Sequence, residues 1–146
     1  MPMKSRFTRR EFMSRTGNVL AAGGVFALLP RLAGAAVKPV TVGFIYVGPR
    51  QDFGWNQAHW VAAKKIAQME GVKVREQENV PETVEVEKIM KSMIQIDGAR
   101  AIFATSFGYW PHVLKVAKEH PDVLFTHIGA LWKPGDPKNA IGYRGY

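Results

Sequence analysis

The apolar positions of the chain alternate between two periods, and this alternation predicts a series of strands and helices. Short runs that are almost wholly apolar and rich in β-branched residues are typical of strands covered on both faces. They are expected at 40–47, 72–78, 100–105 and 123–129, and a fifth extended segment is expected to start at 140–146. Stretches with helical spacing of apolar residues lie between them, at 55–70, 82–97 and 111–119.

The order of these elements predicts the fold class. Strands that alternate with helices at this spacing form right-handed crossovers, which give a parallel sheet with helices on both faces. Glycines at Gly71 and Gly98 and a proline at Pro121 stand where the predicted helices end. The last predicted strand is still in progress at residue 146, so we expect the natural chain to continue.

Residues 1–35 have the features of an export signal, and we expect the mature domain to span 36–146. A basic start is followed by an apolar run at 19–29 and by Ala33-Gly34-Ala35, which fits a small-residue cleavage site. The segment 8–13, TRREFM, resembles the twin-arginine export motif. The alternative is a membrane anchor, but the apolar run is shorter than the roughly 20 residues of a spanning helix.

The net charge and the cysteine content disfavour several classes of function. The chain carries +8, but residues 1–35 hold six basic and one acidic residue, which leaves 14 basic and 11 acidic residues for the mature region. No basic stripe with interleaved aromatics remains there, which disfavours nucleic-acid binding. Without cysteine the chain has no disulfide, thiolate metal site, thiol nucleophile or lipid-acceptor residue. We therefore expect a non-lipidated periplasmic protein exported by the twin-arginine machinery.

Signatures of catalysis are lacking, so the chain is predicted not to be an enzyme and to need no metal or cofactor. The histidines show no metal-binding pairing at His-x-x-His or His-x-x-x-His spacing; they are His59, His112, His120 and His127. Ser106 has no glycine two residues before it, and no phosphate-binding Gly-Lys-Ser/Thr loop occurs. A Rossmann-type oxidoreductase remains an alternative, although Gly48 and Gly54 lack the three-glycine spacing of a dinucleotide loop.

Two aromatic-rich loops are the candidate site. Residues 52–57 (DFGWNQ) and 106–110 (SFGYW) both follow predicted strands, so they should meet at the carboxyl edge of the sheet, where open α/β folds bind ligands. Aromatic walls with a few polar groups suit a flat, polar small molecule, and Asp52 and Asn56 could read its ring nitrogens or hydroxyls. Alternatively, Trp55, Phe107 and Trp110 only pack helix ends onto the sheet.

Four segments together resemble the basic membrane protein (BMP) family, whose members are substrate-binding proteins of ABC transporters, similar to purine-nucleoside receptors. They are VGFIYVG at 42–48, DFGWNQ at 52–57, ENVPE at 78–82 and ATSFGY at 104–109. The resemblance implies a type I periplasmic binding protein with two α/β lobes around a cleft, of which this chain is part of the first. It also implies an ABC permease as partner.

By the same resemblance, Trp55 stacks on a purine, Asn56 and Asp52 belong to the same motif, and 106–109 is the second cleft loop. The chain departs from many lipoprotein relatives in having no cysteine, and the lobe that supplies further ligand contacts is missing. The expected ligand-binding residues are Asp52, Phe53, Trp55, Asn56, Ser106, Phe107 and Tyr109. The expected function is solute binding for a purine base or nucleoside, with an extracytoplasmic sensor domain as a further alternative.

Overall fold

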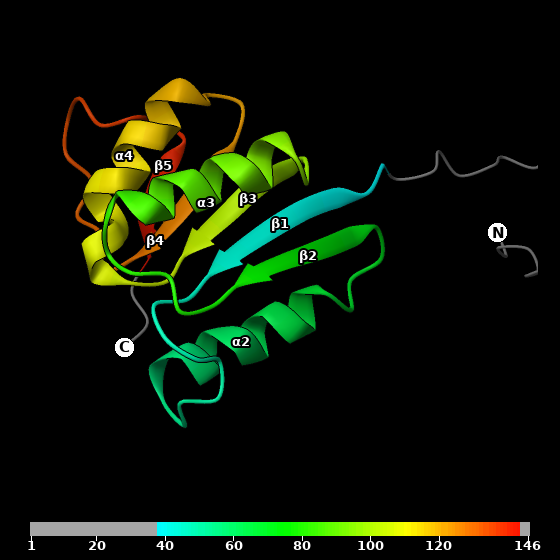
Figure 1. The fold of residues 1–146 in the computed structure, drawn as a ribbon. Coiled ribbons are helices and arrows are strands. Elements are labelled where there is room, and N and C mark those ends of the chain that lie inside the picture. Colours follow the sequence, from blue (N-terminus) through cyan, green and yellow to red (C-terminus); the bar gives the residue numbers. More distant parts are fainter. Residues whose placement is uncertain (1–37, 144–146) are drawn as a thin grey trace, which may run out of the picture. The chain divides into compact units, whose positions relative to one another are not determined.

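The computed structural model describes residues 38–143, which form a five-stranded parallel sheet with helices on both faces (Figure 1). The strand order is β2-β1-β3-β4-β5. The strands are β1 (Val40–Ile45), β2 (Val72–Gln77), β3 (Ala99–Ala104), β4 (Leu124–Ile128) and β5 (Ala140–Tyr143). The helices are α2 (Trp55–Ile66), α3 (Val84–Gln95) and α4 (Trp110–Glu119), with a short 3₁₀ helix, η1 (Phe107–Tyr109), before α4.

The predicted α/β class and every predicted element within 38–143 are confirmed. The first helix ends at Ile66 rather than at residue 70, because the chain turns there toward Gly71, which has a φ of 74°. The segment expected to begin at 140 is a strand as far as Tyr143. The predicted export signal at 1–35 lies outside the described residues.

The two faces of the sheet are covered unequally. Helices α3 and α4 lie side by side on one face, while α2 lies alone on the other, over β1 and β2 (Figure 1). The larger core lies under α3 and α4 and includes Ile45, Met90, Ile102, Val113 and Phe125, each almost fully buried. The smaller cluster beneath α2 contains Val42, Phe44, Tyr46 and Ala63. Packing on both faces explains why the central strands read as continuous apolar runs.

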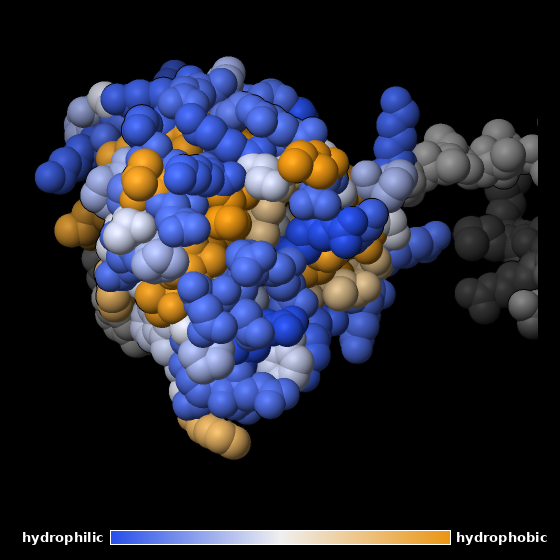
Figure 2. Space-filling view, in the orientation of Figure 1, coloured by the Kyte–Doolittle hydropathy of each residue, from blue (hydrophilic) through white to orange (hydrophobic). Residues whose placement is uncertain are grey.

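All strand pairings are parallel, so every strand ends at the same edge of the sheet. The loops that follow β1, β2, β3 and β4 therefore lie near one another at this carboxyl edge, where α2, α3 and α4 begin (Figure 1). The surface in the same orientation is largely hydrophilic, with hydrophobic groups in small patches (Figure 2). Among the described residues, no helix has both the length and the apolar character to span a bilayer.

Candidate functional site

The β1–α2 loop, residues 46–54, is organised by the carboxylate of Asp52. Its Oδ1 accepts hydrogen bonds from the backbone N–H groups of Gly54 (2.9 Å) and Gln57 (3.0 Å). Its Oδ2 accepts from the backbone N–H of Asn56 (2.9 Å) and from the Asn56 side-chain amide (2.9 Å). Asp52 thus caps the first turn of α2. These donors, led by the Asn56 and Gln57 N–H groups, lower the pKa of Asp52 to about 2.

This capping leaves little of Asp52 for a ligand. A carboxylate has about four acceptor positions, and four donors from its own loop already use them. Asn56 is 5% exposed, and its Nδ2 lies so close to Gly48 that a side-chain carbon there would be 2.8 Å away. Asp52 and Asn56 therefore shape the loop, and Asp52 does so from an exposed position.

Trp55, the first residue of α2, links this loop to the next βα unit. Its Nε1–H donates to the backbone carbonyl of Thr105 at 2.6 Å, and the Thr105 hydroxyl donates to the carbonyl of Ile45 at 2.7 Å. The ends of β1 and β3 and the start of α2 are therefore joined by side-chain hydrogen bonds. The indole is half-buried, not sealed in the core.

The β3–α4 loop, residues 105–109, is held from outside by Glu82, which lies between β2 and α3. One carboxylate oxygen of Glu82 accepts from both the Ser106 hydroxyl and the Gly108 backbone N–H (2.8 Å for the latter). These donors lower the pKa of Glu82. Tyr109 is fully buried and its hydroxyl donates to the carbonyl of Val80 at 2.6 Å. Burial raises the pKa of this hydroxyl.

His127, near the end of β4, supports the same loop from the other side. Its Nε2 donates to the carbonyl of Ser106 at 2.7 Å, and its ring is 1% exposed. Burial lowers the pKa of this imidazole, which favours the neutral form. No sequence pattern singled out Glu82 or His127 for this role, because their partners lie 21 to 26 residues away in the chain.

The two loops bring their aromatic rings together. The rings of Trp55 and Phe107 lie 5.2 Å apart between centroids and are inclined by 44°. Phe107 is 56% exposed, and it packs so closely on Gly129 that a side-chain carbon there would lie 2.4 Å from the ring. A flat ligand sandwiched between two rings needs a separation of about 7 Å. A flat ligand therefore does not fit between Trp55 and Phe107 in this arrangement.

Each of these rings lines a different hollow. Trp55 lines an apolar cavity of about 290 Å³, together with Phe44, His59, Phe103 and Tyr143 among others. Phe107 lines a cavity of about 340 Å³ whose other walls include Trp110, His127 and the segment 129–131. Both volumes suit a small molecule. The segment after β4 was not among the predicted site residues, although its position at the carboxyl edge could have indicated it.

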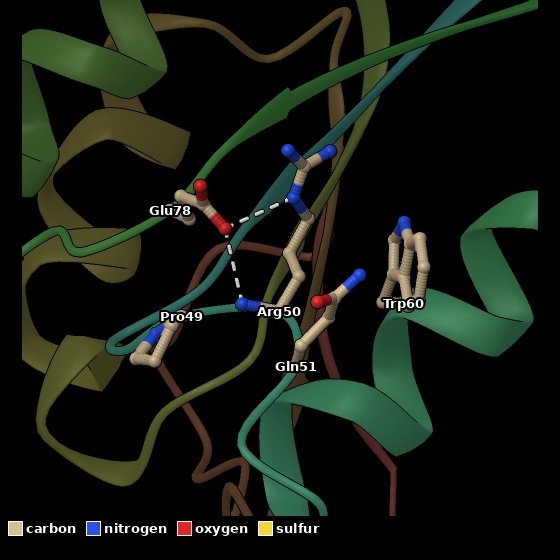
Figure 3. Close-up of a pocket in the computed structure, with 5 residues that line it drawn as sticks. All are labelled: Pro49, Arg50, Gln51, Trp60 and Glu78. Atoms are coloured by element: carbon tan, nitrogen blue, oxygen red, sulfur yellow. Dashed lines mark hydrogen bonds and ion pairs between the residues drawn. The ribbon is translucent and has the colours of Figure 1, made fainter.

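A third cavity, of about 320 Å³, lies at the outer side of the β1–α2 loop, where Pro49, Arg50, Gln51, Trp60 and Glu78 line it (Figure 3). The Arg50 backbone N–H and its Nε both donate to Glu78 Oε2 at 3.0 Å, and Nη1 lies 3.4 Å from Glu76. The hydrogen bond with Glu78 raises the pKa of Arg50. These bonds fix the loop to the end of β2, opposite its attachment through Trp55.

Phe53 occupies the tip of the β1–α2 loop. Its side chain is 93% exposed, and its φ of 57° puts the backbone in the left-handed region that non-glycine residues seldom adopt. At the end of the molecule where this loop lies, a hydrophobic group projects from hydrophilic surroundings (Figure 2).

Of the seven expected site residues, three aromatics reach the surface at this edge and four hold the loops. Phe53, Trp55 and Phe107 are the exposed or half-exposed aromatic members, and Asp52 is exposed as well. Asp52, Asn56, Ser106 and Tyr109 make hydrogen bonds inside the protein, and Tyr109 is wholly covered. No group of acidic and histidine residues among 38–143 has the arrangement of a metal site.

The amides that a dinucleotide pyrophosphate would need are also occupied. Such a ligand binds free N–H groups at a helix N-terminus. At the start of α2 the N–H groups of Asn56 and Gln57 already donate to the Asp52 carboxylate, whose charge would repel a phosphate. The geometry therefore disfavours the Rossmann-type alternative.

Comparisons with known proteins agree with this architecture. The family model for PnrA-like ABC transporter substrate-binding proteins matches residues 39–145. A purine-binding protein of Brucella abortus is 40% identical over 116 residues, which cover 78% of this chain and 33% of that protein. This chain thus spans about a third of that relative's length.

Solved structures show the same fold. A solute-binding protein of an ABC transporter system from Aeropyrum pernix superposes with a TM-score of 0.62 at 23% identity, covering 73% of this chain and 28% of that one. A second, from Conexibacter woesei, has a TM-score of 0.59 at 22% identity and covers 72% and 35%. With the family match over most of the described sheet, the chain belongs to the family of PnrA-like ABC transporter substrate-binding proteins.

Proposed function

We propose that the chain contributes one ligand-binding face of an extracytoplasmic solute-binding protein that hands a purine base or nucleoside to an ABC permease. The single observation that carries this proposal is the meeting of Trp55 and Phe107 at the carboxyl edge. The purine class rests on the printed description of the Brucella relative and on the stacking surface these rings offer.

The site we propose has three contact residues and a supporting frame. Trp55, Phe107 and Phe53 present aromatic surface, and the remaining predicted residues position them. Because a ring cannot fit between Trp55 and Phe107, the opposite face of a bound purine must be covered by another part of a full-length solute-binding protein. Binding would then favour a closed arrangement, by as much as the ligand prefers that state.

Export completes the proposal. We propose that residues 1–35 are a twin-arginine signal and that the mature protein works in the periplasm without a lipid anchor. The paired arginines at Arg9 and Arg10, the apolar run after them and the absence of cysteine support this location.

Replacement of the indole tests the ligand site. We expect Trp55→Leu, which keeps bulk but loses the flat ring, to lower affinity for adenine or adenosine about tenfold, measured by calorimetry with a full-length solute-binding protein that contains this chain. Trp55→Phe keeps a stacking surface and should lose less. Trp60→Leu changes the other half-buried indole of α2, which faces a different cavity, and serves as the control. Absence of binding across purine bases and nucleosides would remove the purine assignment.

A further inference from the structure

We propose that Glu82 is a positioning residue that holds Phe107 in the orientation a ligand meets. This inference rests on the proposed function for its ligand, but the orientation of the loop can be measured without one. Glu82 does not lie in either aromatic loop; it precedes α3, in the turn after β2. Its contacts nevertheless fall on the two residues that flank Phe107, namely Ser106 and Gly108.

The two contacts of Glu82 lie on either side of Phe107 in the chain. A single oxygen, Oε1, accepts from the Ser106 hydroxyl on one side of Phe107 and from the Gly108 N–H on the other. The Gly108 N–H belongs to the peptide unit that follows Phe107, and the Ser106 hydroxyl belongs to the residue before it, so the two bonds restrain the backbone that carries the ring. An ionised acceptor makes such bonds roughly twice as strong as a neutral one.

Gly108 shows how closely the carboxylate approaches. A side-chain carbon at Gly108 would lie 2.5 Å from Glu82 Cδ and 2.6 to 2.8 Å from its oxygens. Any larger residue at 108 must therefore push Glu82 away from the loop. The close approach and the two bonds depend on each other, which indicates a specific contact between the β2–α3 turn and the β3–α4 loop.

The ring that this contact orients lies at the candidate site. Phe107 packs against Gly129 after β4 and against the Trp55 indole, 5.2 Å away between centroids. His127 holds the Ser106 carbonyl from the opposite side, and Tyr109 anchors the end of the loop to Val80. Those anchors fix where the loop starts and ends. Glu82 alone among these groups acts on both neighbours of Phe107.

Amide hydrogen exchange of the full chain provides the first test. Glu82→Ala should accelerate exchange at Gly108, because that N–H loses its acceptor. Glu85→Ala is the matched control: it removes another exposed acid, in the first turn of α3, whose carboxylate has no hydrogen-bond partner among the described residues. Gly108→Ala should have the same effect on the loop as Glu82→Ala, and Glu82→Gln should retain part of the protection, since its amide oxygen can still accept.

Purine affinity provides the second test. We expect Glu82→Ala to weaken adenine binding about fivefold to tenfold, and Glu85→Ala to leave it unchanged. If Glu82→Ala and Glu85→Ala give equal exchange at Gly108, the inference is overturned. Faster exchange with unchanged affinity in Glu82→Ala also overturns it, because Phe107 would then be positioned without consequence for the ligand. If Glu82→Ala accelerates exchange at Gly108 but the wild-type protein binds no purine, the proposed function is refuted, while the contact between Glu82 and the β3–α4 loop stands.

Discussion

In each of the two loops that form the candidate site, one carboxylate accepts several of the loop's hydrogen bonds, but the two carboxylates act over different distances. Asp52 bonds to residues two to five positions ahead of it, inside its own loop and helix. Glu82 bonds to residues 24 and 26 positions ahead, in the next βα unit. The turn that Asp52 caps can therefore form wherever α2 forms, whereas the contacts of Glu82 with the second loop form only when β2, α3 and β3 are already packed together.

This difference also determines what each loop can do. The β1–α2 loop contains a strained residue, because the hydrogen bond from the Gly54 N–H to the Asp52 carboxylate closes a tight turn around Phe53, which has a positive φ. The β3–α4 loop has no residue with a positive φ, but the orientation of its Phe107 depends on Glu82, which lies in the turn after β2. Loss of tertiary packing should therefore disturb Phe107 before it disturbs the turn at Phe53.

The largest effect is expected at the buried anchor of the second loop. Tyr109→Phe removes the hydroxyl that donates to the carbonyl of Val80, and both residues are buried. An unsatisfied buried carbonyl costs about 1 to 3 kcal/mol of folding free energy. Chemical denaturation should show this loss. Tyr143→Phe, which removes a hydroxyl with no hydrogen bond to another described residue, should change stability much less; equal losses would show that Val80 finds another donor.

A smaller loss of stability is expected when the carboxylate of Asp52 is replaced. Asp52→Asn weakens all four bonds at the start of α2, so the melting temperature should fall by a few degrees. Glu70→Gln, at an exposed acid beyond the other end of α2, is the control.

The pH dependence of this effect has a definite sign. The folded-state pKa of Asp52, about 2, lies below its ordinary value of 3.8. Its stabilising contribution is therefore complete above pH 4 or so and is lost as the pH falls toward 2. The stability difference between wild type and Asp52→Asn should shrink over the same interval. A difference that stays constant down to pH 2 would show that the carboxylate charge is not involved.

The sequence predicted the features of the first loop better than those of the second, and the range of the contacts explains why. Strand and helix periodicity predicts every strand and α-helix, though not the 3₁₀ helix η1, and the two aromatic loops lie at one edge as expected. The capping by Asp52 has a local signal, an acidic residue just before a helix start. Glu82 and His127 had no local signal, since only the packed sheet brings them to Ser106.

The smallest effect is expected at Phe53, and it tests whether the local carboxylate imposes strain. Phe53→Asn and Phe53→Ala both remove the exposed ring, but asparagine tolerates the left-handed backbone better than alanine does. The asparagine variant should therefore be more stable than the alanine variant by up to about 1 kcal/mol in chemical denaturation. When each substitution is combined with Asp52→Asn, this difference should shrink, because the turn can then relax.

A difference of the same size with and without the carboxylate would mean that Asp52 does not hold the strained turn, and the contrast between the two loops would have to be explained without it. Since both variants lack the ring, an equal loss of purine affinity in the two would assign Phe53 a direct contact, independent of backbone strain.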